Sequence, residues 1–283
     1  MENCYAILSS VREGLNEYST AWVQGTEIGS YTNRYLIGKI NAAQRFIHSL
    51  VARRVKSYSL KSATLTAVSS VYTLPSDFGR LLYFKDSDGN KISPISPADI
   101  TPTASAGSPY HYYRKGNTLV LDEAGSTSTA TLLYVKKPRD ITTGMASAGG
   151  ALSITLATTA EPVADYYNDM TIENITQSWT DTISDYSAAR VATIAATAAA
   201  SDYYGIVPDI PEPFHYLIAP KAVALVRAEH GLAAKKRVTV DESWFEMFRE
   251  TLLAYAGSDD VANDSIFWDN SPDLCGPIDH NEY

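Results

Sequence analysis

Apolar residues recur at helical spacing near the start of the chain. A first stripe predicts a helix over residues 2–18, and a longer stripe predicts a second helix over about residues 32–56. The apolar positions are Leu8, Val11, Leu15 and Tyr18 in the first stripe, and Leu36, Ile40, Ala43, Ile47, Leu50 and Val51 in the second. Basic side chains fall mostly off the second stripe, so we expect this helix to bury one face.

Two more helices are predicted toward the end of the chain. The prolines within residues 211–213 are typical of a helix start, and Gly231 ends that segment. Asp241 or Ser243 can cap a last helix, which Gly257 closes. The helical side chains that we expect to be buried are Leu36, Ile40, Ile47, Leu225, Phe245, Phe248 and Leu252.

The middle of the chain changes to short segments typical of strands. The expected strands cover residues 71–74, 81–84, 91–95, 109–113, 118–121 and 129–136. Asp88-Gly89 and Gly116-Asn117 mark tight turns, and Pro94 limits its strand to a sheet edge or a loop. Together these segments predict a small antiparallel sheet.

Residues 141–206 differ in composition from the rest of the chain. They hold 14 Ala, 11 Thr and 6 Ser, with Arg190 as their only basic residue. Leu152, Ile154 and Leu156 alternate with polar residues, which favours an inserted β-module. The alternative for part of this segment is an amphipathic helix over 195–200, because Ala favours helix.

This order of elements predicts an α+β fold. Helix pairs at the N- and C-terminal ends form an α-helical bundle platform that carries a small antiparallel β-sheet and the inserted module. The expected domains are residues 1–140 with 207–257 as a helical core with β-hairpin excursions, 141–206 as the β-module, and 258–283 as an extended acidic C-terminal arm.

Charge and cysteine content exclude some classes of function and of site. The net charge of −9 argues against a protein that binds nucleic acid by neutralising phosphates. Cys4 and Cys275, at opposite ends of the chain, supply no disulfide framework and no Cys-based metal site. The first 25 residues lack the order of a signal peptide and no apolar run is long enough to span a membrane, so we expect a soluble protein made in a reducing cytoplasm.

Motifs for catalysis are absent from the sequence. It contains no phosphate-binding Gly-x4-Gly-Lys-Ser/Thr loop, no Gly-x-Ser-x-Gly nucleophile turn and no His-Glu-x-x-His zinc spacing. Residues 86–90 resemble the start of a calcium loop but lack its later ligands, which favours a hairpin turn. We therefore expect no catalytic residues, no cofactor and no metal site.

Three stretches carry a resemblance to a known family. They are Ile-Asn-Ala-Ala-Gln-Arg at 40–45, Tyr-Thr-Leu-Pro-Ser-Asp-Phe-Gly-Arg-Leu at 72–81, and Pro-Glu-Pro-Phe-His-Tyr-Leu-Ile at 211–218. In this order they are similar to the head-to-tail adaptor (connector) proteins of tailed bacteriophages. The chain departs from the family pattern at 174–180, where a glycine-rich loop is expected and no glycine occurs.

The resemblance implies a virion protein of the neck region without enzymatic activity, present in the host cytoplasm during assembly. It would form a ring of twelve subunits that docks on the portal protein and extends the DNA channel. The ring would also provide the platform for a downstream tail or nozzle protein. Double-stranded DNA would pass through without sequence-specific binding, and no membrane would be involved.

Two other classes of function stay open from the residues alone. A surface module could recognise carbohydrate, because the chain has 19 Tyr residues that could stack on sugars. A glycan-cleaving enzyme could use paired acids such as Asp181 and Asp185.

The acidic arm over 258–283 contains the candidate binding residues. It carries seven acids and no Lys or Arg, yet it includes the apolar cluster Ile266, Phe267 and Trp268. Buried aromatic side chains are common anchors of protein contacts. We expect these three residues to bind the portal or a neighbouring subunit; the alternative is that they fold back on their own subunit.

Overall fold

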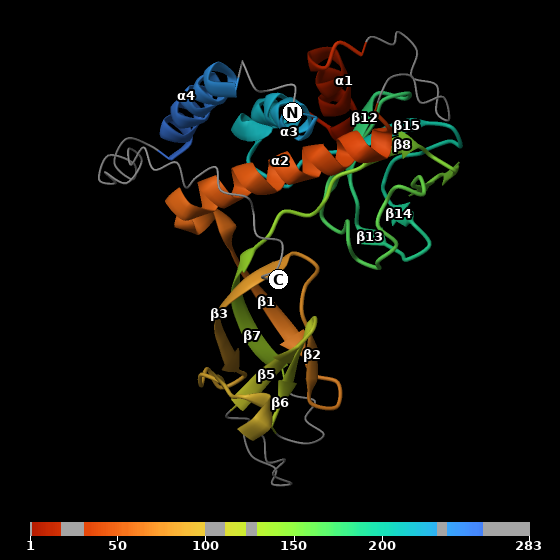
Figure 1. Cartoon of the computed structure of the whole chain (residues 1–283). Helices are drawn as coiled ribbons and strands as arrows, with labels where there is room; N and C mark the ends of the chain where they lie inside the picture. The colour runs from red at the N-terminus through yellow and green to blue at the C-terminus, as the bar shows by residue number, and fades with distance from the viewer. Residues whose placement is uncertain (1, 18–30, 100–110, 123–128, 231–236, 257–283) are drawn as a thin grey trace.

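The computed structural model describes residues 2–17, 31–99, 111–122, 129–230 and 237–256. Its α-helices are α1 (Cys4–Gly14), α2 (Asn33–Arg54), α3 (Ile218–Glu229) and α4 (Arg237–Ala256). Short 3-10 segments are η1 (Lys56–Ser59), η2 (Pro97–Asp99) and η3 (Glu212–Leu217). The helices gather at one end of the molecule, where α2 lies across the top of a β-structure that extends away from it (Figure 1).

Local chemistry explains where the first two helices begin. The side chain of Asn3 accepts a hydrogen bond from the backbone N–H of Ala6, and Thr32 accepts one from Tyr35, which satisfies N–H groups that have no partner within the helix. At the other end of α1, Arg227 from α3 donates to the carbonyl oxygen of Gly14 at 2.6 Å. The predicted positions of these helices are confirmed to within a few residues.

Fifteen strands are present among the described residues. They are β1 (Leu60–Thr66), β2 (Val71–Thr73), β3 (Phe78–Asp86), β4 (Ser93–Pro94), β5 (His111–Lys115), β6 (Thr118–Leu121), β7 (Thr129–Lys136), β8 (Thr143–Met145), β9 (Ala148–Gly150), β10 (Ser153–Thr155), β11 (Thr171–Asn174), β12 (Trp179–Thr182), β13 (Asp185–Tyr186), β14 (Val191–Thr193) and β15 (Tyr203–Ile206). All pair antiparallel except β4 with β5, which are parallel.

The strands form four sheets. The orders β1-β7-β3 and β2-β6-β5-β4 belong to the part of the chain between α2 and residue 136, and β4 is an edge strand, as its proline predicts. The orders β12-β11-β15-β8 and β13-β14-β10-β9 belong to residues 143–206. The hairpin expected over 86–90 is present, with Gly89 at a φ of +86° where a side chain would be strained.

Buried apolar side chains divide into two clusters. The first, which we call the mixed core, joins the four helices to the sheets of residues 143–206. In it Leu8 of α1, Ile40 of α2 and Tyr204 of β15 are fully buried. The second, the β-core, lies between the sheets of residues 60–136 and is built around Tyr72, Leu132 and other residues of these sheets.

The expected α-helical bundle platform is wrong. Within the described residues the fold is rich in β-structure, with fifteen strands in four sheets and four α-helices. The helices pack on one another, but α1 also packs against β15 and β8, so the sheets of residues 143–206 supply part of the cover for the helical faces. Residues 195–200 contain no helix, so the helical alternative for this part of the segment is also wrong.

The helix registers were largely predicted. Leu36, Ile40, Ile47, Phe248 and Leu252 are buried as expected. Two of the expected positions were misplaced: Leu225 is only partly buried, and Phe245 is 37% exposed because the neighbouring Trp244 takes the inward position on α4. The Trp244 Nε1 donates to the carbonyl oxygen of Leu217 at 3.0 Å, which fixes this side of the helix.

The domain boundaries at residues 140 and 207 stay a prediction. One contact joins the helices to residues 143–206 across these boundaries. The carboxamide of Asn3, which caps α1, donates to Glu173 of β11 at 2.5 Å. A Cβ atom added to Gly205 would lie 2.7 Å from the Asn3 Oδ1, so β15 approaches this cap closely. Residues 143–206 and the helices therefore share one core.

Candidate functional site at the junction of the two cores

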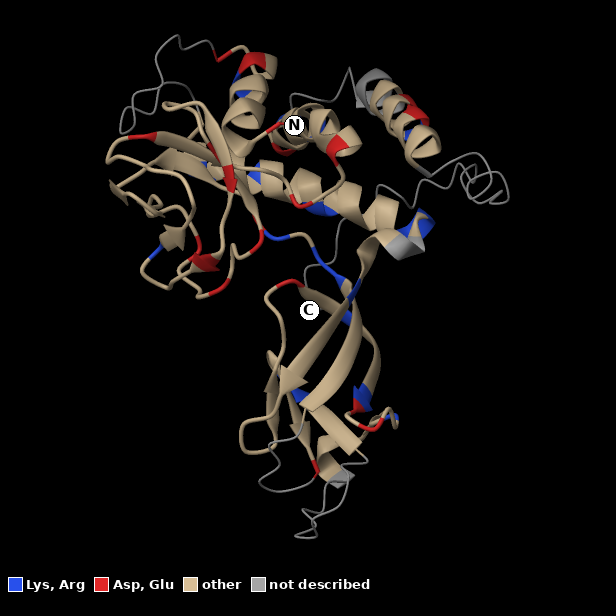
Figure 2. Ribbon diagram, turned by 180° about the vertical axis from the view of Figure 1, so that it is seen from behind, with Lys and Arg blue, Asp and Glu red and all other residues tan. Residues whose placement is uncertain are grey.

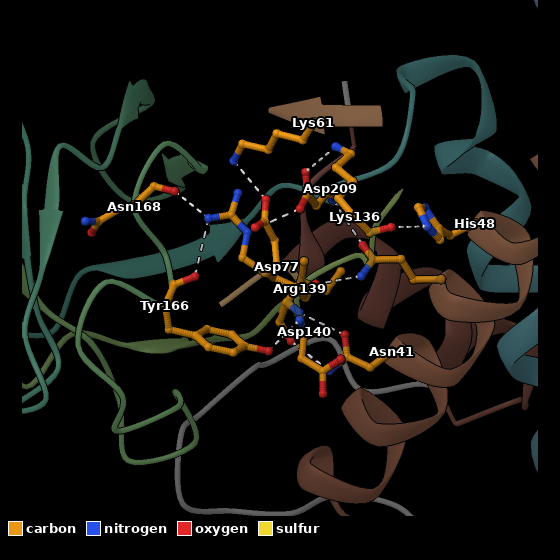
Figure 3. A network of polar contacts seen from close by, with 12 residues as sticks. Asn41, His48, Lys61, Asp77, Lys136, Arg139, Asp140, Tyr166, Asn168 and Asp209 are labelled. Carbon is orange, nitrogen blue, oxygen red and sulfur yellow. Dashed lines mark hydrogen bonds and ion pairs between the residues drawn. The ribbon is translucent and has the colours of Figure 1, made fainter. Parts of the chain in front are cut away.

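One face of α2 fixes the chain segment that leaves the β-core. The Asn41 side chain makes two hydrogen bonds with the backbone of Ile141. Its Nδ2 donates to the carbonyl oxygen at 3.0 Å, and its Oδ1 accepts from the N–H at 2.8 Å. The Gln44 Nε2 donates to the carbonyl oxygen of Arg139 at 2.8 Å. These polar side chains come from neighbouring turns of one helix face, so α2 holds successive backbone groups of residues 136–141 (Figure 3).

His48 continues this face one turn further along α2. Its Nε2 lies 2.9 Å from the carbonyl oxygen of Lys136, and its Nδ1 lies 3.1 Å from the hydroxyl of Tyr58. A carbonyl oxygen only accepts, so Nε2 carries the proton and Nδ1 accepts from the hydroxyl. Burial lowers the pKa of His48 below its ordinary value, which favours the neutral ring.

Arg139 lies at the centre of the junction. Its Nε donates to Asp209 at 3.2 Å, and its Nη1 donates to the carbonyl oxygens of Tyr166 and Asn168. Lys136 binds the other oxygen of the Asp209 carboxylate, also at 3.2 Å. Arg139 therefore connects residues 136–141, which we call the crossing segment, to residues 166–168 and to the loop before η3 (Figure 3).

Asp77 anchors the β-core side of the junction. It is 3% exposed, and its carboxylate accepts from Lys61 at 2.8 Å and from the hydroxyl of Tyr134 at 2.7 Å. Burial alone would raise the pKa of Asp77, but these two hydrogen bonds outweigh it, and the pKa is lowered. The carbonyl oxygen of Asp77 also accepts from the N–H of Lys137 at 2.8 Å, so the turn before β3 holds the chain as it leaves β7.

The polar contacts of the junction join different parts of this chain to one another. Its anions face cations, its helix side chains face backbone groups, and the Arg45 guanidinium and Asp140 form an ion pair at the rim. The low pKa of Asp77 is the opposite of what a general acid requires. This arrangement can hold two cores in one relative position, and basic residues line the connection between them (Figure 2).

Sites for the two alternative functions are not assembled in the β-module. Asp181 accepts backbone hydrogen bonds from Thr182, Ala195 and Ala196 at 2.7–2.8 Å. Burial raises the pKa of Asp181, but those hydrogen bonds outweigh it and lower the pKa, which does not suit the acid of a glycan-cleaving pair.

The tyrosines of the same module mostly face inward. Tyr167, Tyr186 and Tyr204 are each at most 1% exposed, so their rings cannot stack on a sugar. Across the described parts of the chain, no group of three His, Cys, Asp or Glu side chains could hold a metal ion. Nor is any described helix long and apolar enough to cross a membrane.

The predicted binding residues Ile266, Phe267 and Trp268 lie outside the described residues, and their role stays a prediction. The junction residues were not predicted as a site. The available signal was the spacing of Asn41, Gln44 and His48, polar side chains three and four residues apart on the apolar face of a predicted helix.

Comparison with known families decides the identity. A family model described as SU10 adaptor protein matches residues 3–156, more than half of the chain. The chain belongs to the SU10 adaptor protein family. The resemblance to phage head-to-tail adaptors is therefore confirmed, and the chain is a structural adaptor of bacteriophage virions. No curated protein matches it.

The match to the adaptor family covers most of the elements that build the junction, although Tyr166, Asn168 and Asp209 lie outside it. It includes α1, α2, the whole β-core and the crossing segment over 136–141. It ends at Leu156, just after β10. Two of the three stretches that carried the resemblance, 40–45 and 72–81, thus fall inside the match and supply Gln44 and Asp77 to the junction.

Proposed function

We propose that this chain forms a ring at the neck of a tailed phage, docks on the portal protein and carries the tail. The observation that supports this most directly is the match to the adaptor family over residues 3–156. In this proposal the portal and a tail or nozzle protein are the partners on either side of the ring. The protein acts by position, and it performs no chemical reaction.

The junction supports a role in which distance and orientation matter. An adaptor between two assemblies has to keep its two contact surfaces in a fixed relation. Here the chain passes between the cores twice, after α2 and again over residues 136–141, and the ion pair of Arg139 with Asp209, largely shielded from water, fastens the second passage. Removing Asp209 would leave both Arg139 and Lys136 without their ion-pair partner, so this carboxylate favours the native position.

The charge of the chain suits a channel for DNA. Each subunit carries a net charge of −9, so a ring of twelve subunits is strongly negative. A negative wall repels the phosphate backbone and lets DNA slide without adhering. Twelve subunits and passage of DNA through the ring are both part of the proposal.

The acidic arm provides the contact with the portal in this proposal. Ile266, Phe267 and Trp268 would insert into a groove of the portal or of a neighbouring subunit. An arm that makes its final contacts only when it docks on the portal would couple assembly to the correct partner.

The proposal is tested by mixing the purified chain with portal rings and examining the products by native mass spectrometry and electron microscopy. The full chain should add a ring to the portal. A chain stopped after Gly257 should stay folded, as judged by circular dichroism, but fail to attach, and Trp268→Ala should attach more weakly. Attachment of the shortened chain at full strength would refute the role of the arm. Failure of the full chain to bind any portal ring would refute the function itself.

A further inference from the structure

One face of the sheet β1-β7-β3 packs against neither core. On the central strand β7, Ala130, Leu132 and Tyr134 are buried in the β-core. Side chains alternate along a strand, so Leu133 and Val135 point to the opposite face. Both are partly exposed, and neither packs with the mixed core or with the β-core.

The neighbouring strands extend this face with apolar and basic side chains. The strand register places Leu60 and Arg80 on either side of Val135, and Lys85 next to Thr131. Leu60 is 42% exposed, and so is Leu82, the unpaired residue at the β-bulge between Leu81 and Tyr83. We call the surface the outer sheet face and define it by Leu60, Arg80, Tyr83, Lys85, Leu133 and Val135. The outward positions of the three strands carry two cations and no Asp or Glu.

The last described helix ends beside the top of this face. The ring of Tyr255, in the last turn of α4, lies 5.4 Å from the ring of Phe214 in η3. The carbonyl oxygen of Asp209, just before η3, lies 3.3 Å from the hydroxyl oxygen of Tyr58, and Tyr58 precedes Leu60 by two residues. Asp209 and Phe214 are five residues apart in the chain, so these two contacts connect the end of α4 to the start of β1.

The chain that follows α4 has the composition to cover this face. Residues 258–283 carry seven acids and no Lys or Arg, which complements Arg80 and Lys85. Ile266, Phe267 and Trp268 would cover the exposed leucines. Ten extended residues reach about 33 Å, whereas a strand of seven residues such as β1 spans about 23 Å. The apolar cluster can therefore reach any part of the face.

We propose that, in the free subunit, residues 258–283 dock on the outer sheet face of their own chain. The tether favours this contact because it holds the segment at a high local concentration beside the face. The contact covers apolar surface that would otherwise promote association between free subunits. It concerns the chain before assembly, so it goes beyond the ring proposal and stands or falls separately from portal binding.

Cysteine cross-linking tests the proposal in the full chain. Thr64→Cys introduces a thiol at an outward, exposed position of β1, and the natural Cys275 lies in the docking segment. Under copper phenanthroline oxidation these two thiols should form an intrachain disulfide, identified by peptide mass spectrometry. Thr73→Cys is the matched control, because Thr73 is also exposed on a strand of the β-core but belongs to the other sheet. We expect Thr64→Cys to cross-link at least about fivefold faster than the control.

Charge reversal and amine labelling complete the test. Arg80→Glu combined with Lys85→Glu should remove the difference between the two cysteine variants. Lys85 labelling needs no substitution. Acetylation of Lys85 should be faster in a chain stopped after Gly257 than in the full chain. Equal cross-linking of Thr64→Cys and Thr73→Cys, or equal labelling of Lys85, would overturn the proposal. Disulfides formed only between chains would assign the face to a second copy and would likewise overturn it.

Discussion

The side-chain amide of Gln44 donates a 2.8 Å hydrogen bond to the carbonyl oxygen of Arg139, which lies 95 residues further along the chain. The same side chain accepts from the backbone N–H of Asp209 at 3.2 Å. One fully buried amide of α2 therefore connects two distant loops at the junction of the cores. In an adaptor, this connection bears on how firmly the two cores are held together.

Gln44→Leu should destabilise the protein by about 2–4 kcal/mol. The leucine fills a similar volume but leaves the carbonyl oxygen of Arg139 and the N–H of Asp209 buried without their partner. The measurement is urea unfolding followed by circular dichroism. Arg53→Ala, at an exposed position of the same helix, is the control and should change stability by less than about 0.5 kcal/mol. Equal stabilities of the two variants would show that the amide contributes little.

Ile47→Asp should cost several kcal/mol, because Ile47 is fully buried in the mixed core and the new carboxylate has no partner there. Phe245→Asp is the matched comparison: Phe245 is 37% exposed, so the same charge meets water. Thermal melting of both variants checks the inward and outward faces of α2 and α4. If Ile47→Asp melts like the parent, the register of α2 is wrong.

Stability should depend on pH through His48. Its pKa is lowered in the folded protein, so the unfolded chain takes up the proton first as the pH falls. The contribution of His48 is therefore present above its ordinary pKa near 6.5 and is lost as the pH falls below it. His215, which is also buried with a lowered pKa, acts with the same sign.

His48→Gln should flatten part of this dependence between about pH 7 and pH 5, because the amide can still donate to Lys136 but does not titrate. Free energies of unfolding measured at several pH values test this. An unchanged slope in the variant would mean that His48 does not contribute to it.

Removing residues 141–206 tests how the chain is divided. If these residues were a separable module, joining Asp140 to Val207 through a short Gly/Ser linker would keep the helical circular dichroism signal. The shared core predicts loss of that signal, because Ile7 and Leu8 of α1 pack in the same cluster as Tyr204 and Ile206 of β15. A retained helical signal with cooperative melting would favour the separable module.

Replacing residues 60–136 with a linker is the comparison. The buried side chains of this part form their own cluster, so the mixed core should survive as a folded, less stable unit. Loss of all helical signal there as well would show that the two cores fold only together.

Local patterns predicted the helices and most strands, because each depends on a short stretch of sequence. The stripe containing Ile40 and Ile47 and the turn at Asp88-Gly89 are examples. The bundle platform was wrong because apolar periodicity shows that a helix buries a face, but not what covers it. Here part of the cover for α1 comes from β15, a strand of only four residues that lies far away in the sequence.

The junction shows the same limit. The spacing of Asn41, Gln44 and His48 marks a polar row on a buried face, which the sequence displays. Their partners are backbone groups of residues 136–141, and backbone groups carry no signal of their own in a sequence. The ion pair between Arg139 and Asp209 joins loops 70 residues apart, so only the fold brings them together.

The most direct test of the account is a cryo-electron microscopy reconstruction of the neck of the phage that encodes this chain. We expect a ring of density between portal and tail into which the mixed core and the β-core both fit, joined at Arg139 and Asp209 as in the free chain. Absence of this protein from the neck, or its location at the capsid surface or on tail fibres, would contradict the proposed function.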